Sequence, residues 1–445
     1  MYRLAYQRLV QWMGAVARKP MILRGVRHVG KTRLMAAFAE EFFPNNQHYF
    51  NFELQPDLTR IFGASRVPDD ILESLAFVSG RPVAPCSLLI FDEAQTCPDA
   101  IHALKYFCEL RPDLRILLAG SLLGLDFARP KSFPVGKVDF MTLEPMTFTE
   151  FLMAQGETSL VELLKTRTVL EPLPEIFFKR LCTKLSHFEL VGGMPEPVAA
   201  WCLSQDLALV KSAQTRILQS YLADVESHAQ ALDVPKIKRI WESLPQQLSR
   251  ENKQFRYSVV EPRSNARRYG DALQWLMDAR ITRRVHRTKT LGYPLSAYEE
   301  LNAFKAYFVD TGLLCRLARI DETVLFEDSP SFREMKGALT ENLVLQSLVC
   351  QYEDAPHYWA RTNPSAEVDF LVEQRGRIIP IEVKSSTNIS SPSLRKFKEA
   401  FGDQVSLRVR LSLRNLSLDG DILNIPLFMV DETKRLIDIA LNKVQ

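Results

Sequence analysis

The sequence predicts an α/β protein built from three consecutive regions. Short apolar runs alternate with helical patterns through residues 1–155, as they do in a parallel sheet whose strands are joined by helices. Residues 156–330 have mainly helical spacing, and residues 331–445 begin with a helical stretch and continue into strands. A chain of 445 residues is long enough for about two to three domains. We therefore expect domain boundaries close to residues 155 and 330.

The composition excludes several classes of protein. Apolar residues make up 46% of the chain and charged residues 24%, which are globular values. No run reaches the roughly 18 apolar residues of a membrane span, and residues 1–20 read as an amphipathic helix because Arg and Gln interrupt their apolar stretch. The seven cysteines form no C-x-x-C pair, and the seven histidines are scattered. We expect a cytoplasmic protein without a membrane segment, a disulfide framework or a zinc site.

Four apolar runs in the first region have the length of buried strands. They are Met21–Arg24, Gln47–Phe52, Ser87–Phe91 and Arg115–Ala119. The first is followed by the pattern G-x-x-x-x-G-K-T and then by an amphipathic helical stretch. Glycines in this pattern allow a tight turn whose backbone N–H groups face phosphates, and the following helix adds its positive end.

This loop is the expected ATP site, with Mg²⁺ as the cofactor. Lys31 can reach the β- and γ-phosphates, and Thr32 offers a hydroxyl to the metal ion. The alternative is an ordinary glycine-containing turn, but the apolar strand before the motif and the helix after it favour the nucleotide site. The residues expected to bind nucleotide here are Gly25, Val26, Arg27, His28, Val29, Gly30, Lys31, Thr32 and Arg33.

Polar residues follow two more of the apolar runs. The third run ends in Asp92-Glu93, where Asp92 can hold Mg²⁺ and Glu93 can polarise the attacking water. Two acids after a strand are often only a solvated turn, but a strand at a workable distance after a phosphate loop favours the catalytic interpretation. The fourth run ends in Gly120-Ser121, and Ser121 would lie near the γ-phosphate if this strand sits between the other two.

Ten segments together resemble a large bacterial and archaeal family of AAA+ ATPases with a C-terminal region of unknown function. The resemblance covers nearly the whole chain. The segments are RKPMILRGVRHVGKT, YFNFE, LLIFDEAQ, ALKYFCELRPDLRILLAGSLLG, SFPVGKVDFMTLEPMTFTEFL, LVGGMPEPV, FKAYFVDTGLL, ALTENLV, EVDFLVE and IIPIEVK.

This resemblance implies an AAA+ core with an added strand between the two strands that carry the nucleotide motifs. By position, Lys31 and Thr32 match Walker A, Asp92 and Glu93 match Walker B, and Ser121 matches sensor 1. The family usually has Gln where this chain has His28, so nucleotide affinity can differ here. Lys137 matches a family position without an assigned role, and Arg115 and Arg129 are candidate arginine fingers.

The C-terminal region contains acids and a lysine in a nuclease-like pattern. Glu341 falls in a helical stretch, Asp369 in a strand, and Glu382 and Lys384 two residues apart in another strand, where they share a face. The three carboxylates could bind Mg²⁺, and Lys384 could steady a developing charge or a nucleophilic water. The pattern resembles the restriction-endonuclease-like fold, with an acid followed by (Asp/Glu)-x-Lys. The alternative is a surface strand with alternating charges.

A basic segment precedes this region. Residues 236–289 contain fourteen Lys/Arg against five Asp/Glu, whereas the whole chain carries a net charge of only +3. Two helical stretches followed by the strands 281–290 and 291–300 look like a winged helix. Residues 263–278 would then face DNA, and Arg283, Arg284 and Arg287 would form the wing. The alternative is a solvated face, or a surface that contacts the acidic remainder of the protein.

Three functions are consistent with these patterns. The first is an ATP-dependent switch or motor acting on a macromolecule, with DNA as the preferred target because of the basic segment and the nuclease-like end. The second is a non-hydrolysing, ATP-binding regulator whose partner is a protein, and self-association is also open. The third is a Mg²⁺-dependent nuclease for which ATP is only a control input.

Overall fold

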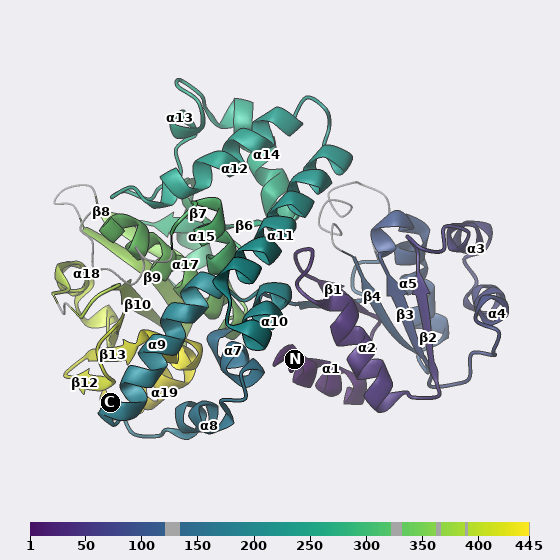
Figure 1. The fold of residues 1–445 in the computed structure, drawn as a ribbon, viewed down its shortest axis with the longest axis horizontal. Coiled ribbons are helices and arrows are strands. Elements are labelled where there is room, and N and C mark those ends of the chain that lie inside the picture. Colours follow the sequence, from purple (N-terminus) through teal and green to yellow (C-terminus); the bar gives the residue numbers. More distant parts are fainter. Residues whose placement is uncertain (121–133, 322–331, 362–365, 388–389, 445) are drawn as a thin grey trace. The chain divides into compact units, whose positions relative to one another are not determined.

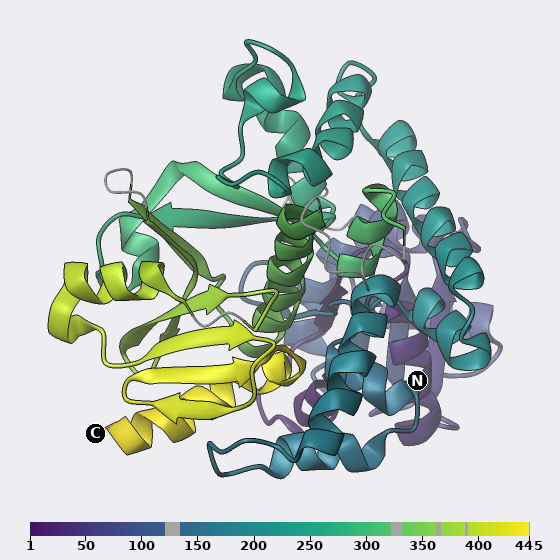
Figure 2. The same cartoon turned by 60° about the vertical axis from the view of Figure 1, so that its left-hand side comes forward.

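The computed structural model describes residues 1–120, 134–321, 332–361, 366–387 and 390–444. The chain divides into two compact units (Figures 1 and 2). We call residues 2–144 with 278–281 the N-terminal unit. We call residue 1 with 145–277 and 282–445 the C-terminal unit.

The N-terminal unit is built on a five-stranded parallel sheet with the strand order β2-β3-β4-β1-β5. Its strands are β1 (Met21–Arg24), β2 (Gln47–Asn51), β3 (Leu88–Asp92), β4 (Arg115–Ala119) and β5 (Asp139–Thr142). The central strands are buried nearly throughout, which explains why they read as continuous apolar runs. The predicted parallel α/β sheet is therefore confirmed, and β4 lies between β1 and β3 as the family resemblance implies.

In the described residues of this unit, the sheet is accompanied by five helices and one short 3₁₀ turn. They are α1 (Ala5–Gly14), α2 (Lys31–Phe42), α3 (Leu58–Ala64), α4 (Pro68–Ser79), α5 (Pro98–Leu110) and the turn η1 (Ala94–Thr96). A core of fully buried aromatic and aliphatic side chains, including Phe50, Phe91 and Leu118, joins the sheet to α3, α4 and α5. This packing fixes the carboxyl ends of the strands, where the nucleotide motifs lie.

The C-terminal unit contains an eight-stranded mixed sheet with the order β12-β13-β11-β10-β9-β8-β6-β7. Its strands are β6 (Thr282–Thr288), β7 (Glu299–Phe308), β8 (His357–Arg361), β9 (Ala366–Gln374), β10 (Arg377–Val383), β11 (Arg408–Ser412), β12 (Ser417–Asp419) and β13 (Ile422–Pro426). Strands β6 and β7 come from the predicted middle region, and the other six come from the predicted C-terminal domain. A domain boundary near residue 330, as we expected, would therefore divide the strands of one sheet between two domains.

The described residues of this unit contain twelve helices, of which the first eight precede the sheet in the sequence. They are α7 (Phe148–Ala154), α8 (Thr158–Thr166), α9 (Glu175–Val191), α10 (Pro195–Ser204), α11 (Leu207–His228), α12 (Val234–Leu248), α13 (Tyr257–Val260), α14 (Ala266–Asp278), α15 (Thr311–Leu317), α17 (Arg333–Gln351), α18 (Pro392–Phe401) and α19 (Thr433–Val444), with the 3₁₀ turns η2 (Leu295–Tyr298), η4 (Gly402–Gln404) and η5 (Leu427–Glu432). Helix α18 packs on β9 and β10 through Leu394 and Phe397. None of the helices in the described residues is both long enough and apolar enough to cross a membrane.

The predicted winged helix is not formed. Strand β6 matches the first predicted strand, but residues 291–298 contain only a 3₁₀ turn and the second strand begins at Glu299. Strand β6 pairs with β7 on one edge and with β8 on the other. A wing needs a free hairpin, whereas this hairpin is the end of the large sheet. Sequence patterning missed this arrangement because the β6–β8 pairing joins residues far apart in the chain.

Three of the segments that carry the family resemblance meet at one buried point of the C-terminal unit. The Asp310 carboxylate accepts hydrogen bonds from the Gly193 and Leu313 backbone N–H groups at 2.6 and 2.9 Å. Gln346 donates to the same carboxylate and to the Met146 carbonyl. A Cβ on Gly193 would lie 2.1 Å from the Met146 carbonyl oxygen, so only glycine fits there. These motifs therefore have a structural role in packing α9, α15 and α17 together.

Candidate nucleotide site and the C-terminal acidic residues

The loop between β1 and α2 has the backbone that a phosphate site requires. Gly25 has φ 155° and Gly30 has φ 99°, and His28 also adopts a positive φ of 65°. A Cβ on Gly25 would lie 2.4 Å from the carbonyl oxygen of Leu143, so a larger residue would displace the strand beside it. Helix α2 begins at Lys31 directly after this turn, and its unpaired backbone N–H groups face the loop.

Lys31 is folded onto the loop in this structure. Its ammonium donates hydrogen bonds to the carbonyl oxygens of Gly25 and Val26 at 2.9 and 3.1 Å. Burial lowers the pKa of Lys31 to about 8, although the carboxylates of Glu93 and Asp92 oppose the shift. An anionic phosphate would therefore meet a cation that is already desolvated and held against the loop.

Thr32 and Asp92 connect the two nucleotide motifs directly. The Thr32 hydroxyl donates a hydrogen bond of 2.8 Å to the Asp92 carboxylate, although the two residues are 60 positions apart. The Tyr49 hydroxyl donates to the same carboxylate oxygen at 2.8 Å, and the Glu93 backbone N–H donates to the other at 3.0 Å. Asp92 is buried, so its carboxylate is held in place by these three donors.

Glu93 is held by its own backbone and by a neighbour. It adopts the left-handed conformation with φ 52°, which is uncommon for a residue with a side chain and often marks a functional position. Gln95 donates a hydrogen bond of 2.7 Å to the Glu93 carboxylate. The carboxylate is thereby oriented at the end of β3, beside Asp92.

Two residues at the site were missed by the sequence reasoning. Arg3 is buried and donates to the carbonyl oxygen of Val29 in the phosphate loop at 2.9 Å, and also to the Glu144 carbonyl. Tyr49 belongs to β2, the neighbour of β3, and reaches Asp92 across that strand pair. Arg3 lies in none of the segments that carry the family resemblance, and Tyr49 lies in YFNFE without an assigned role. Each acts through a contact that only the folded chain creates.

The remaining predicted residues of this unit have varied positions. His28 is exposed at the turn, and Arg33 is exposed on the first turn of α2. Lys137 forms an ion pair of 2.9 Å with Glu109. Ser121 and Arg129 lie outside the described residues, so their predicted roles stay predictions.

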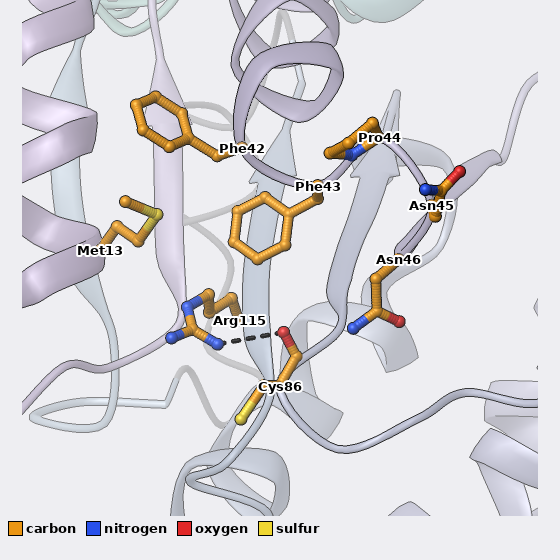
Figure 3. Close-up of a pocket in the computed structure, with 8 residues that line it drawn as sticks. All are labelled: Met13, Phe42, Phe43, Pro44, Asn45, Asn46, Cys86 and Arg115. Carbon is orange, nitrogen blue, oxygen red and sulfur yellow. Dashed lines mark hydrogen bonds between the residues drawn. The ribbon is translucent and has the colours of Figure 1, made fainter.

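Arg115 lines a pocket near the amino ends of strands β3 and β4 (Figure 3). It begins β4, whereas the nucleotide motifs follow the carboxyl ends of β1 and β3. Its guanidinium donates a 3.0 Å hydrogen bond to the Cys86 carbonyl. The pocket has a volume of about 460 Å³ and is lined by Met13, Phe42, Phe43, Pro44, Asn45, Asn46, Cys86 and Arg115. Arg115 therefore does not belong to the nucleotide site of its own chain.

ATP and Mg²⁺ fit the residues of the phosphate loop. Glycines with positive φ shape the loop, and Lys31 supplies a cation held against its carbonyl groups. The Thr32 hydroxyl and the Asp92 carboxylate are oxygen ligands of the kind that Mg²⁺ prefers, and they already touch each other. The assignment of these residues to nucleotide and metal rests on this geometry together with the motif chemistry.

The four C-terminal candidates do not converge on one centre. Glu341 and Asp369 lie within 4.0 Å of the buried Lys305 ammonium, at 3.7 and 4.0 Å. Glu382 instead pairs with Lys384 at 2.7 Å. Within the described ranges, no group of three or more His, Cys, Asp or Glu side chains has an arrangement that could hold a metal ion. The prediction that Glu341, Asp369 and Glu382 form one metal site is therefore wrong.

Three family models match separate parts of the chain. Residues 17–152 match an AAA domain. Residues 183–324 and 336–428 match two families described as domains of unknown function, DUF8612 and DUF4143. The N-terminal unit thus carries an AAA domain of the P-loop type, in agreement with its fold and its motifs.

Among whole proteins, the similar ones are distant. Uncharacterised proteins of Mycobacterium tuberculosis and Mycobacterium bovis are each 28% identical over 402 residues, which cover 87% of this chain and 75% of theirs. The Walker-type ATPase of Pyrococcus abyssi has 15% identity and a TM-score of 0.45, covering 71% of this chain and 95% of its own. The Aeropyrum pernix ORC1 protein, solved in complex with DNA, has 13% identity and a TM-score of 0.31, covering 74% and 95%. Likenesses at this level assign no role to this chain.

Proposed function

We propose that this protein binds ATP with Mg²⁺ at the loop 25–32 and hydrolyses it. The observation that carries the proposal is the hydrogen bond between Thr32 and Asp92, because it joins the two motifs in the arrangement that a metal-bound nucleotide needs. The AAA domain match over residues 17–152 supports the same chemistry.

The residues of the chain have distinct tasks in this reaction. The loop backbone and Lys31 bind the phosphates, while Thr32 and Asp92 would hold the metal ion. Mg²⁺, when bound, would neutralise charge that develops on the phosphates. Glu93, oriented by Gln95, accepts a proton from the attacking water or polarises it. The burial of Asp92 and the hydroxyl of Tyr49 keep the metal-binding carboxylate from rotating.

Replacing Thr32 with Val tests this proposal. Valine keeps the shape of the side chain and removes the hydroxyl that we assign to the metal ion, so the Mg²⁺-dependent part of ATP affinity should fall. We expect a loss of about tenfold, comparable to one hydrogen bond to a charged group. Titration of a fluorescent ATP analogue with Mg²⁺ and with EDTA separates the two parts of the affinity.

Thr32→Ser is the matched control, because serine restores the hydroxyl and should restore the Mg²⁺ effect. A Thr32→Val protein that is folded and keeps the full Mg²⁺ enhancement would show that this hydroxyl does not face the metal ion. If neither wild type nor Thr32→Ser binds ATP at all, the whole proposal fails.

We propose that hydrolysis drives a switch or motor that acts on a macromolecule, with DNA as the preferred target. The support is the basic segment 236–289, although part of it is already neutralised. Glu300 pairs with Arg287 and with Lys289, and the Arg284 guanidinium lies 4.5 Å from the centre of the Phe304 ring. The cations that remain exposed are nearer to α13 and α14.

Three of these exposed cations are Arg256, Arg263 and Arg267. If DNA binds here, replacing all three with Ala should weaken binding to every DNA sequence by a similar factor. The slope of log affinity against log salt should also become shallower by roughly 0.9 for each DNA phosphate that the protein no longer neutralises. Fluorescence anisotropy of a labelled duplex at several salt concentrations measures both effects.

A variant with Ala at the exposed residues Arg60, Lys179 and Arg395 removes the same charge from other surfaces. It should bind DNA like the wild type. Equal losses in the two triple variants would mean that only net charge matters. If DNA affinity changes neither with salt nor with the substitutions, the basic segment is better interpreted as a solvated face. If DNA does not change the rate of ATP hydrolysis, a protein partner is favoured.

A further inference from the structure

Five charged residues lie together between the sheet and α17 in the C-terminal unit; Lys305 and Glu341 are buried, and the other three are partly exposed. We call Lys253, Lys305, Glu341, Glu367 and Asp369 the Lys305 cluster. The Lys305 side chain is fully buried, and its ammonium lies 2.5 Å from Glu367, 3.7 Å from Glu341 and 4.0 Å from Asp369. Lys253 pairs with the other oxygen of Glu341. Burying an ammonium this completely is favourable only when carboxylates surround it.

Lys305 occupies the position between the carboxylates that a divalent ion would need. Mg²⁺ requires oxygen ligands at about 2.0–2.1 Å in near-octahedral geometry, which leaves no room for the ammonium at the same point. Other carboxylate oxygens of the cluster are also engaged. Tyr307 donates to Glu341 at 3.0 Å, and the Val383 backbone N–H donates to Asp369 at 2.8 Å. The residues present therefore do not fit the metal ion that the nuclease-like pattern implies.

The acids of the cluster already face positive charge without a metal ion. Burial raises the pKa of Asp369 to about 8, and the neighbouring Glu341 adds to the rise. Burial alone would also raise the pKa of Glu341, but Lys253 and Lys305 hold it at about 2. The ammonium groups of Lys305 and Lys253 therefore already supply positive charge to these acids. A divalent ion would add to that charge.

We infer that Lys305 is the resident cation of this three-carboxylate cluster, standing in place of a divalent metal ion. The C-terminal unit then has no Mg²⁺-dependent cleavage centre at these acids. Glu341 and Asp369, two of its nuclease-like residues, instead help to hold the sheet, α17 and the segment around Lys253 together. This inference is independent of the ATPase proposal, because it concerns the other unit and a different set of residues.

Replacing Lys305 with Ala tests the inference. The variant removes the ammonium and leaves the carboxylates and a space between them, so its Tm should fall by several degrees. Millimolar Mn²⁺ or methylammonium should then raise the Tm of Lys305→Ala above its value in NaCl of equal ionic strength. Any rise from Mn²⁺ bound at the phosphate loop is common to both proteins, so the rise should be larger in Lys305→Ala than in the wild type.

Lys384→Ala is the matched control, because it also removes an ammonium beside a glutamate but lies outside the cluster. It should gain no more stability from Mn²⁺ or methylammonium than the wild type does. A folded Lys305→Ala protein that also gains no more than the wild type would overturn the inference.

A second measurement needs no lysine variant to fold. Supercoiled plasmid incubated with the wild type and Mg²⁺ or Mn²⁺ should remain intact. Nicking that disappears in Asp369→Asn would show a working metal centre at these acids and would overturn the inference. Intact plasmid, together with a smaller rise of Tm in Mn²⁺ for the wild type than for Lys305→Ala, supports Lys305 as the cation of the site.

Discussion

Glu93→Gln should bind ATP as the wild type does and hydrolyse it about a hundredfold more slowly or worse. The amide keeps the size of the side chain and removes the group that polarises water, and general-base help of this kind contributes roughly 10²–10⁴ in rate. Binding should survive because the phosphates are held by the loop backbone and Lys31, and the metal ion by Thr32 and Asp92. The left-handed backbone of Glu93 is compatible with Gln as well as with Glu.

The measurement is single-turnover hydrolysis beside equilibrium binding of ATP. Glu53→Gln is a matched control, because Glu53 is an exposed acid of the same unit and lies outside the site. That variant should turn over at the wild-type rate. A wild-type hydrolysis rate in Glu93→Gln would show that another group acts as the general base. Loss of ATP binding would mean that Glu93 mainly stabilises the loop.

The fold of the N-terminal unit could be predicted closely because its signals are local. Strands that are buried on both faces must be apolar throughout, so the sequence shows where they begin and end. The predicted bounds of β1 (Met21–Arg24) and β4 (Arg115–Ala119) agree with the structure at both ends. The turn after β1 requires glycine at two positions, and this requirement is visible as a motif. Thr32 and Asp92 follow from the same motifs, and the structure brings them into contact.

The C-terminal unit depends on contacts that no local pattern reveals. The pairing of β6 with β8 joins Arg287 to Tyr358, so a hairpin that looked free became part of a sheet. The Lys305 cluster likewise draws its members from a loop, a helix and two strands. A signal was present, since Lys305 interrupts the apolar run of residues 303–308 in β7, and a lysine buried there must be paired. Only the folded structure shows that the partners of Lys305 include Glu341 and Asp369, which the sequence pattern had suggested as metal ligands.

Lys31→Ala should weaken ATP binding by roughly 10- to 150-fold. Hydrogen bonds to charged groups contribute about 1.5–3 kcal/mol, and the ammonium is the cation that the loop itself holds inside its turn. The effect should exceed that of Thr32→Val, because Lys31 contacts phosphate whether or not the metal ion is present. The loss should therefore be nearly as large in EDTA as in Mg²⁺, which distinguishes the two residues.

Titration of ATP into the variant by calorimetry, with and without Mg²⁺, measures this difference. Lys105→Ala removes the same charge from an exposed position on α5 of the same unit and should leave the affinity unchanged. Circular dichroism and the Tm establish that Lys31→Ala is folded, which is needed because Lys31 also bonds the Gly25 and Val26 carbonyls. A folded Lys31→Ala protein with wild-type affinity in both conditions would show that ATP does not bind at this loop, since phosphates bound there would meet the Lys31 ammonium directly.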